Sequence, residues 1–296
     1  MTSRVTSPQA SPVTSPVSPT SPLELPALGF GTYRLRGEAG RDAVTSALSL
    51  GYRLIDSAYS YENEGTVGAG IRAAVESGVV DRDEVIYTSK LPGRYQHRED
   101  ALATVAESVW RAGIGPIDLY LIHWPNPGQG LYVEAWQALI EARDRGLVKH
   151  IGVCNFLPEH LATLERETGE LPEVNQIEMH PAFPQTGGVG GTLDWDTAHG
   201  VLTEAWSPLG RGGALTSAPV RSAAAAHGAT PAQVVLAWHR ALGSVAIPKA
   251  SSRARQQENL ESLQLELSAG EVDAITALGR IDGRMKGQDP AVYEEF

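Results

Sequence analysis

Four polar residues stand where short apolar runs of the sequence end. Asp56 and Tyr61 lie in LIDSAYSYENE, Lys90 ends VIYTSK, and His123 follows LYLI. If these runs are parallel strands, their carboxyl ends share one edge of a sheet, which is where α/β proteins place their chemistry. A tyrosine, a lysine, an aspartate and a histidine gathered at that edge would form a proton-transfer group.

Tyr61 is the proton donor in this interpretation. A free phenol has a pKa of about 10, and a neighbouring ammonium group lowers that pKa by favouring the phenolate. Lys90 would supply the ammonium, and Asp56 would keep the lysine charged and oriented. His123 would donate a hydrogen bond to a substrate carbonyl or share the transferred proton. Together the four residues would polarise a carbonyl and protonate the developing alkoxide.

Eight apolar runs are each followed by an amphipathic stretch, which predicts alternating strands and helices. The predicted strands are 27–31, 53–56, 84–89, 117–122, 149–153, 174–179, 201–206 and 244–247. The predicted helices are 40–50, 63–77, 98–112, 132–145, 158–168, 192–199, 218–227, 231–240 and 253–263. Strand–helix repeats imply a parallel sheet, and eight of them in about 260 residues match a single-domain (β/α)8 TIM barrel. A doubly wound sheet ranks second because it usually has fewer strands.

Composition narrows the function classes. Residues 1–22 are rich in Ser, Thr and Pro and are expected to be a disordered tail, which leaves residues 23–296 as the folded domain. The net charge of −11 argues against nucleic-acid or anionic-membrane binding, and no apolar run is long enough for a transmembrane helix. The only cysteine, Cys154, excludes an internal disulfide and suits a reducing compartment. We therefore expect a cytoplasmic monomer without a metal site.

The order and spacing of the motifs resemble those of the aldo-keto reductases, and most of all the bacterial 2,5-diketo-gluconate reductase group. The motifs are LGFGTYRL, GYRLIDSAYSYENE, YTSKL, DLYLIHWP, IGVCNF, NQIEMHP, EAWSPLGRG and IPKASSRARQQENL. The resemblance runs from about residue 25 to residue 290. It implies a carbonyl reductase in which Asp56, Tyr61, Lys90 and His123 form the catalytic tetrad.

The resemblance also implies an NADPH cofactor and a small-molecule carbonyl substrate. Asn155 and Gln176, with Cys154 beside them, match the residues at the nicotinamide carboxamide, and Trp206 matches the aromatic that stacks on the nicotinamide ring. The pyrophosphate and adenosine half are expected at Ser207, Leu209, Gly210, Lys249, Ser251, Arg255, Glu258 and Asn259. The substrate is expected at Tyr33, Trp124 and His123, with Tyr59 a weaker candidate. Because Cys154 and Ala250 stand where many members have serine, the use of NADH stays open.

Two other functions were weighed against carbonyl reduction. A barrel aldolase would form a Schiff base on Lys90 or Lys249, which requires an uncharged lysine. A non-catalytic or slow dinucleotide-binding redox sensor would be expected to lack part of the tetrad, and all four tetrad residues are present in the sequence.

Overall fold

Eight parallel strands form the centre of the molecule, in the order β1 to β8, in a computed structural model that describes residues 22–296. The strands are β1 (Phe30–Gly31), β2 (Leu54–Asp56), β3 (Ile86–Leu91), β4 (Ile117–Ile122), β5 (Val148–Cys154), β6 (Val174–Glu178), β7 (Leu202–Trp206) and β8 (Val245–Ala246). Parallel bridges from Leu28 to Ala246 and from Gly31 to Lys249 join the last strand to the first. The sheet therefore closes on itself, and the predicted (β/α)8 barrel is confirmed.

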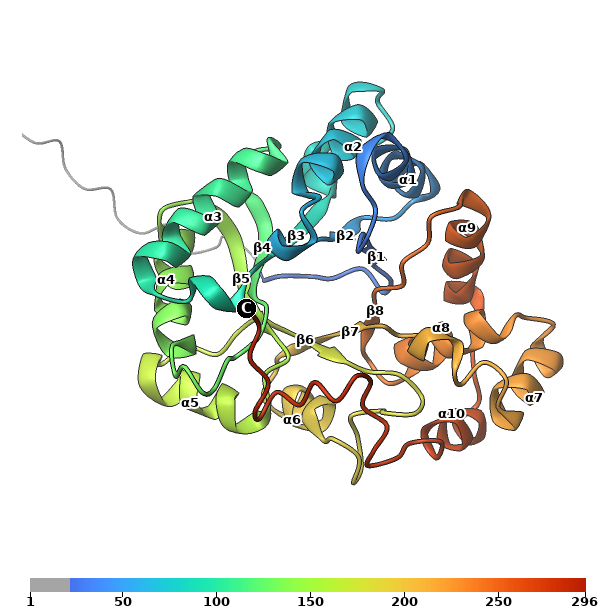
Figure 1. The fold of residues 1–296 in the computed structure, drawn as a ribbon. Coiled ribbons are helices and arrows are strands. Elements are labelled where there is room, and N and C mark those ends of the chain that lie inside the picture. The colour runs from blue at the N-terminus through green and yellow to red at the C-terminus, as the bar shows by residue number, and fades with distance from the viewer. Residues whose placement is uncertain (1–21) are drawn as a thin grey trace, which may run out of the picture.

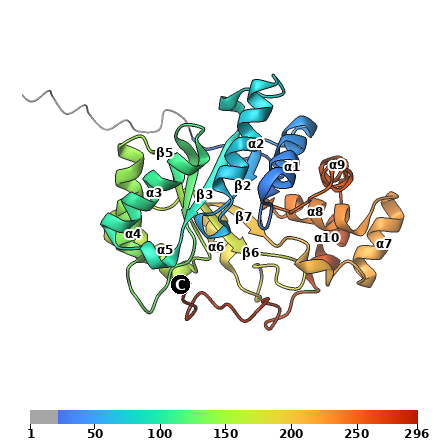
Figure 2. The ribbon, with the colours of Figure 1, turned by 45° about the horizontal axis from the view of Figure 1, so that its top comes forward.

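Helices surround the strands on the outside of the barrel (Figures 1 and 2). The α-helices are α1 (Gly37–Leu50), α2 (Glu64–Glu76), α3 (Arg98–Ala112), α4 (Tyr132–Asp144), α5 (Pro158–Thr168), α6 (Thr192–Ala198), α7 (Ala218–His227), α8 (Pro231–Ala241), α9 (Arg253–Glu261) and α10 (Ala269–Thr276). The short 3₁₀ helices are η1 (Tyr59–Tyr61), η2 (Arg82–Glu84), η3 (Gly93–Tyr95), η4 (Gly210–Gly212) and η5 (Ser262–Gln264). The apolar faces of the α-helices pack on the strands. The largest fully buried side chains, Trp136 and Trp238, come from α4 and α8.

Most predicted elements lie where the sequence placed them. Strand 117–122 and helices 98–112, 158–168 and 218–227 have the predicted bounds, whereas β1 and β8 are shorter than expected. Helix α9 ends at Glu261, and residues 262–264 form a 3₁₀ turn in place of the predicted end of that helix. Helix α10 was not predicted, although Ser268 and Glu271 form a capping box at its start.

Two glycines have clear structural reasons. Gly113 ends α3 with a left-handed backbone, φ 61°, and its N–H donates to the Val109 carbonyl oxygen. Gly68 lies where α2 passes α3 so closely that a Cβ atom would be 1.8 Å from the carbonyl oxygen of Ala112. A side chain at residue 68 would therefore force the two helices apart.

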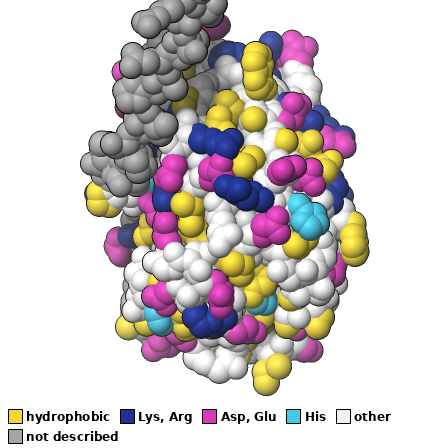
Figure 3. Space-filling model, turned by 90° about the vertical axis from the view of Figure 1, so that its left-hand side faces the viewer, with side chains coloured by type: hydrophobic (Ala, Val, Ile, Leu, Met, Phe, Trp, Pro, Cys, Tyr) yellow, Lys and Arg dark blue, Asp and Glu magenta, His cyan; other side chains and the backbone are white. Residues whose placement is uncertain are grey.

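One side of the barrel's outer surface carries many charged side chains (Figure 3). On the side where α3, α4 and α5 lie, basic and acidic side chains are interspersed (Figure 3). Ion pairs there include Arg98 with Glu141 and Arg143 with Glu170. Within residues 22–296, no helix combines the length and the apolar character needed to cross a membrane.

The chain after α10 runs back past α6 to the loops at the barrel mouth (Figures 1 and 2). It is fixed at Glu295, whose backbone N–H donates to Asn126 Oδ1 at 3.0 Å and whose carbonyl oxygen accepts from Asn126 Nδ2 at 2.8 Å. Nearly all of the predicted tail, residues 1–21, lies outside the described part of the chain.

Candidate active site

A buried ion pair lies at the carboxyl ends of β2 and β3. Lys90 Nζ is 2.5 Å from Asp56 Oδ2 and 2.7 Å from the carbonyl oxygen of Ser57, and the lysine side chain is completely buried. Burial lowers the pKa of Lys90, but Asp56, Tyr61 and Cys154 together raise it by more, so the pKa lies above its usual value. Lys90 therefore remains charged at neutral pH.

Tyr61 lies beside this pair, at the end of η1. Lys90 Nζ is 5.2 Å from the centre of the Tyr61 ring, and the His123 ring centre is 6.0 Å from it. Burial raises the pKa of the phenol above its usual value and outweighs the opposing charge of Lys90. The expectation of a lowered pKa for Tyr61 is therefore wrong for the protein alone, because burial of the phenol outweighs the charge of Lys90. Tyr61 therefore holds its proton at neutral pH.

His123 follows β4 and contacts a carboxylate that the sequence analysis did not identify. Its Nδ1 is 2.7 Å from Glu295 Oε1, and both side chains are nearly buried. Glu295 approaches from the C-terminal segment, so no motif around the barrel strands pointed to it. Tyr293 of the same segment packs on Trp124 with ring centres 4.4 Å apart, and it was missed for the same reason.

Gln176 connects the tetrad to the interior of the barrel. Its Nε2 donates to Asp56 Oδ2 at 3.0 Å and to Glu204 Oε2 at 2.7 Å. Both amide hydrogens are thereby used, whereas Gln176 Oε1 receives only the weak Cys154 Sγ contact at 3.8 Å. Gln176 is held with its carbonyl oxygen free to accept a stronger hydrogen bond.

Glu204, on β7, is a second carboxylate that the sequence analysis did not single out. It is completely buried, and burial raises its pKa to about 7, with the nearby charge of Asp56 adding to the shift. Gln176 and Lys90 oppose that rise only in part. Two buried carboxylates, Asp56 and Glu204, are thus joined by one amide.

Asn155 and Trp206 form a second connected pair. Trp206 Nε1 donates to Asn155 Oδ1 at 2.8 Å, and Asn155 Nδ2 donates to the His123 carbonyl oxygen at 3.0 Å. Asn155 adopts a left-handed backbone, φ 64°, as does Ser207 with φ 49°. Such strained positions gather at functional sites. These contacts fix the orientation of the Trp206 indole at the cavity wall.

These side chains surround a cavity of about 940 Å³ at the carboxyl ends of the strands. Its walls include thirteen predicted site residues, namely Tyr33, Asp56, Tyr61, His123, Trp124, Cys154, Asn155, Gln176, Trp206, Ser207, Leu209, Lys249 and Arg255. Lys90 does not line the cavity but bonds Asp56, which does. Gly210, Ser251, Glu258 and Asn259 lie outside it, and Tyr59 lines a neighbouring cavity instead.

Five cationic side chains line the larger cavity of this acidic protein. The sequence analysis identified Lys249 and Arg255, whereas Arg34 and Lys286, which lie on loops, and Arg211, which lies in the short η4, were missed. A local positive surface of this kind suits a strongly anionic ligand such as a phosphorylated dinucleotide. The residues present therefore fit the predicted cofactor: cations for phosphates, an indole face for an aromatic ring, and amide groups for a carboxamide.

Comparison with known proteins agrees with this geometry. The family model described as the aldo/keto reductase family matches residues 27–280. The 2,5-diketo-D-gluconic acid reductase B of Corynebacterium sp. (strain SHS752001) is 46% identical over 269 residues, which cover 90% of this chain and 94% of that protein. The methylglyoxal reductase DkgA of Escherichia coli (strain K12) is 39% identical over 268 residues, with 90% and 93% covered.

Solved structures show the same similarity. A Gox0644 variant in complex with NADPH superposes with a TM-score of 0.85 at 38% identity, covering 95% of this chain and 99% of that one. The Bombyx mori aldo-keto reductase in complex with NADP gives a TM-score of 0.82 at 29% identity, with 92% and 94% covered. On the strength of the motif order, the closed barrel and these matches, the chain belongs to the aldo/keto reductase family.

Proposed function

We propose that this protein reduces aldehydes or ketones to alcohols with NADPH, and that Tyr61 donates the proton. The observation that carries the proposal is the charged, buried Lys90–Asp56 pair beside a protonated tyrosine at the wall of a cavity. The bound dinucleotide would supply a hydride to the carbonyl carbon. Tyr61 would protonate the carbonyl oxygen, and Lys90 would stabilise the phenolate that remains.

The other two tetrad residues have supporting roles in this proposal. Asp56 accepts hydrogen bonds from Lys90 and Gln176 and so keeps the lysine charged and in place. His123 would orient the substrate carbonyl toward Tyr61. Because an aldolase lysine must lose its proton, the raised pKa of Lys90 argues against a Schiff base at that residue.

Residues from the second half of the barrel would hold the cofactor. Trp206 would stack on the nicotinamide ring, while Gln176 Oε1 and Asn155 would receive the carboxamide beside Cys154. The phosphates would lie along Ser207, Leu209, Gly210, Lys249, Ser251, Arg255, Glu258 and Asn259, with Lys249 and Arg255 nearest the 2′-phosphate. Two cations at that position favour NADPH over NADH.

We propose small carbonyl compounds as the substrates, including dicarbonyl compounds and keto sugars. The relatives named 2,5-diketo-D-gluconic acid reductase B and methylglyoxal reductase support this class. Tyr33 and Trp124 would provide an aromatic wall for the carbon chain. We further propose that the protein acts as a cytoplasmic monomer.

Tyr61→Phe tests the proposal, and Tyr59→Phe is its matched control. The first variant should lose about 10²- to 10⁴-fold in kcat with an aldehyde substrate, since it removes the proton donor, and should still bind NADPH. Tyr59 lies on the same 3₁₀ turn but bonds Arg111 at 3.1 Å outside the larger cavity, so its variant should keep normal turnover. Unchanged turnover in Tyr61→Phe would reject the assignment, and no NADPH oxidation by the unmodified protein would favour a redox sensor.

A further inference from the structure

The proposed mechanism assigns no role to the contact between His123 and Glu295. Glu295 Oε1 lies 2.7 Å from His123 Nδ1, which is ion-pair distance for a protonated imidazole, although the two atoms do not meet the geometry of a hydrogen bond. Within residues 22–296, no lysine or arginine is within ion-pair distance of Glu295. His123 is therefore the basic side chain that this carboxylate contacts.

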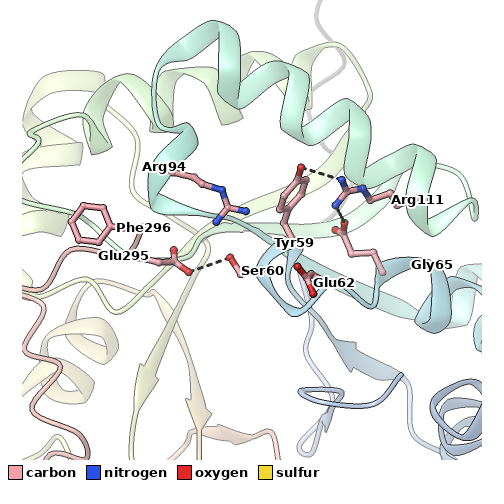
Figure 4. A pocket seen from close by; sticks show the side chains of 9 residues that line it. Tyr59, Ser60, Glu62, Gly65, Arg94, Arg111, Glu295 and Phe296 are labelled. Carbon is pink, nitrogen blue, oxygen red and sulfur yellow. Dashed lines mark hydrogen bonds and ion pairs between the residues drawn. The ribbon is translucent and has the colours of Figure 1, made fainter. Parts of the chain in front are cut away.

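The Glu295 carboxylate is held in place from several sides. Its Oε2 accepts from the backbone N–H of Gly93 at 2.9 Å, and its Oε1 accepts from Ser60 Oγ at 3.2 Å. Figure 4 shows this side chain reaching Ser60 across a smaller cavity of about 600 Å³. Asn126 fixes the backbone of Glu295 through two hydrogen bonds. A chain segment far from the barrel strands thus delivers one carboxylate to one histidine.

Glu295 is ionised in this setting. Burial raises its pKa, but His123 together with the Gly93 and Ser60 donors lowers it by more. An ionised carboxylate has only lone pairs and negative charge to present, so at 2.7 Å it would repel a bare nitrogen lone pair, and the nitrogen that faces it must carry a hydrogen. Nδ1 of His123 is thereby committed to Glu295, whereas His123 Nε2 makes no hydrogen bond to residues 22–296 and belongs to a residue that lines the larger cavity.

We propose that Glu295 is a positioning residue that holds His123 as a cation, so that Nε2 donates a hydrogen bond to the substrate carbonyl oxygen. If Nδ1 carries a hydrogen, Nε2 can donate only when the ring is positively charged. A buried negative charge at 2.7 Å stabilises that cation. This inference rests on the proposed carbonyl reductase function and assigns the donor form of its histidine.

Glu295→Gln tests the inference, because it removes the charge and keeps the shape and the ability to bond Gly93 and Ser60. Glu294→Gln is the matched control, because Glu294 belongs to the same C-terminal segment. Its Oε1 accepts from the backbone N–H of Gly128 at 2.6 Å, and it does not contact His123. We expect Glu295→Gln to lower kcat by about tenfold, the difference between a charge-assisted and a neutral donor, with the NADPH dissociation constant unchanged. Glu294→Gln should match the unmodified protein in both.

A second measurement separates this role from simple anchoring of the segment. In a His123→Gln background, adding Glu295→Gln should have no further effect on kcat, because the carboxylate acts through the histidine. Full kcat in Glu295→Gln, equal losses in the two glutamate variants, or multiplicative losses in the double variant would each overturn the inference. A Tyr61→Phe variant that kept its turnover would instead reject the proposed function itself.

Discussion

Lys90 and Asp56 form an ion pair inside the barrel, with Nζ 2.5 Å from Oδ2 and the lysine side chain shielded from solvent. Charges buried in this way depend on each other, because neither can be hydrated when its partner is removed. The pair therefore contributes to two properties at once, the stability of the barrel and the charge beside Tyr61.

Asp56→Asn should lower the free energy of unfolding by about 3–5 kcal/mol, because it leaves the Lys90 ammonium buried without its anion. The variant should also lose turnover, since the lysine would no longer be held charged beside the phenol. Urea unfolding and NADPH oxidation measure the two effects. The double variant Asp56→Asn with Lys90→Met should recover part of the stability and none of the activity. A stable, active Asp56→Asn protein would contradict this account.

Glu204→Gln should flatten the pH dependence of stability. The folded pKa of Glu204 is raised to about 7, above its usual 4.5, so the folded state holds a proton that the unfolded state releases. Stability is then full below the unfolded pKa and falls by roughly 3 kcal/mol as pH rises from about 4.5 to 8. Thermal melts at pH 4, below the unfolded pKa, should coincide for both proteins, and at pH 8 the variant should be the more stable.

A buried aspartate provides the check on that measurement. Burial also raises the pKa of Asp196 to about 7, so the unmodified protein should lose stability in the same pH range from two groups. The gain from Glu204→Gln at pH 8 should therefore persist in an Asp196→Asn background. Parallel stability curves for the Glu204→Gln and unmodified proteins would count against a protonated Glu204.

Lys249→Met should weaken NADPH binding by about tenfold and NADH binding by less than about threefold, because the lysine is proposed to pair with the 2′-phosphate. Fluorescence titration with both dinucleotides gives the comparison. Arg253→Met is a suitable control, since Arg253 belongs to the same region but donates to Ser49 Oγ at 2.8 Å, away from the cavity. Equal losses for the two dinucleotides would place Lys249 elsewhere on the cofactor.

Gly68→Ala should destabilise the protein by about 3 kcal/mol, because the new Cβ would collide with the carbonyl oxygen of Ala112 and the helices would have to separate. Gly270, in α10, has no atom within 4 Å of the same position, so Gly270→Ala should stabilise by about 0.5–1 kcal/mol. Denaturant midpoints of the two variants should move in opposite directions. A neutral Gly68→Ala would show that α2 and α3 can shift freely.

The order of the elements was predictable because strands and helices leave different periodicities in the sequence. The short lengths of β1 and β8 were not predictable, since these strands pair with each other only when the barrel closes. Pro248 also lacks the N–H that would extend the ladder of β8. Helix α10 had a readable start at Ser268 and Glu271, and this capping signal was overlooked.

The candidate site likewise contains residues that the sequence predicted and residues that it did not. Residues at strand ends, such as Asp56 and Lys90, were placed by local sequence, because a strand fixes where its last side chains point. Glu295, Arg34 and Lys286 reach the cavities from loops and the C-terminal segment, whose paths depend on packing against the finished barrel. The pKa of Tyr61 was also unpredictable, since its direction depends on how deeply the phenol is buried.

The amide of Gln176 has a consequence for how this barrel can change. The proposed tetrad comes from residues 56–123 and the proposed cofactor contacts from residues 154–259, a division that would allow each half to vary separately. Gln176 links them through Asp56 on one side and Glu204 on the other. A substitution near Gln176 in the cofactor half can therefore change the hydrogen bonding of Asp56, the partner of Lys90. Exchanging that half between relatives would then also change catalysis.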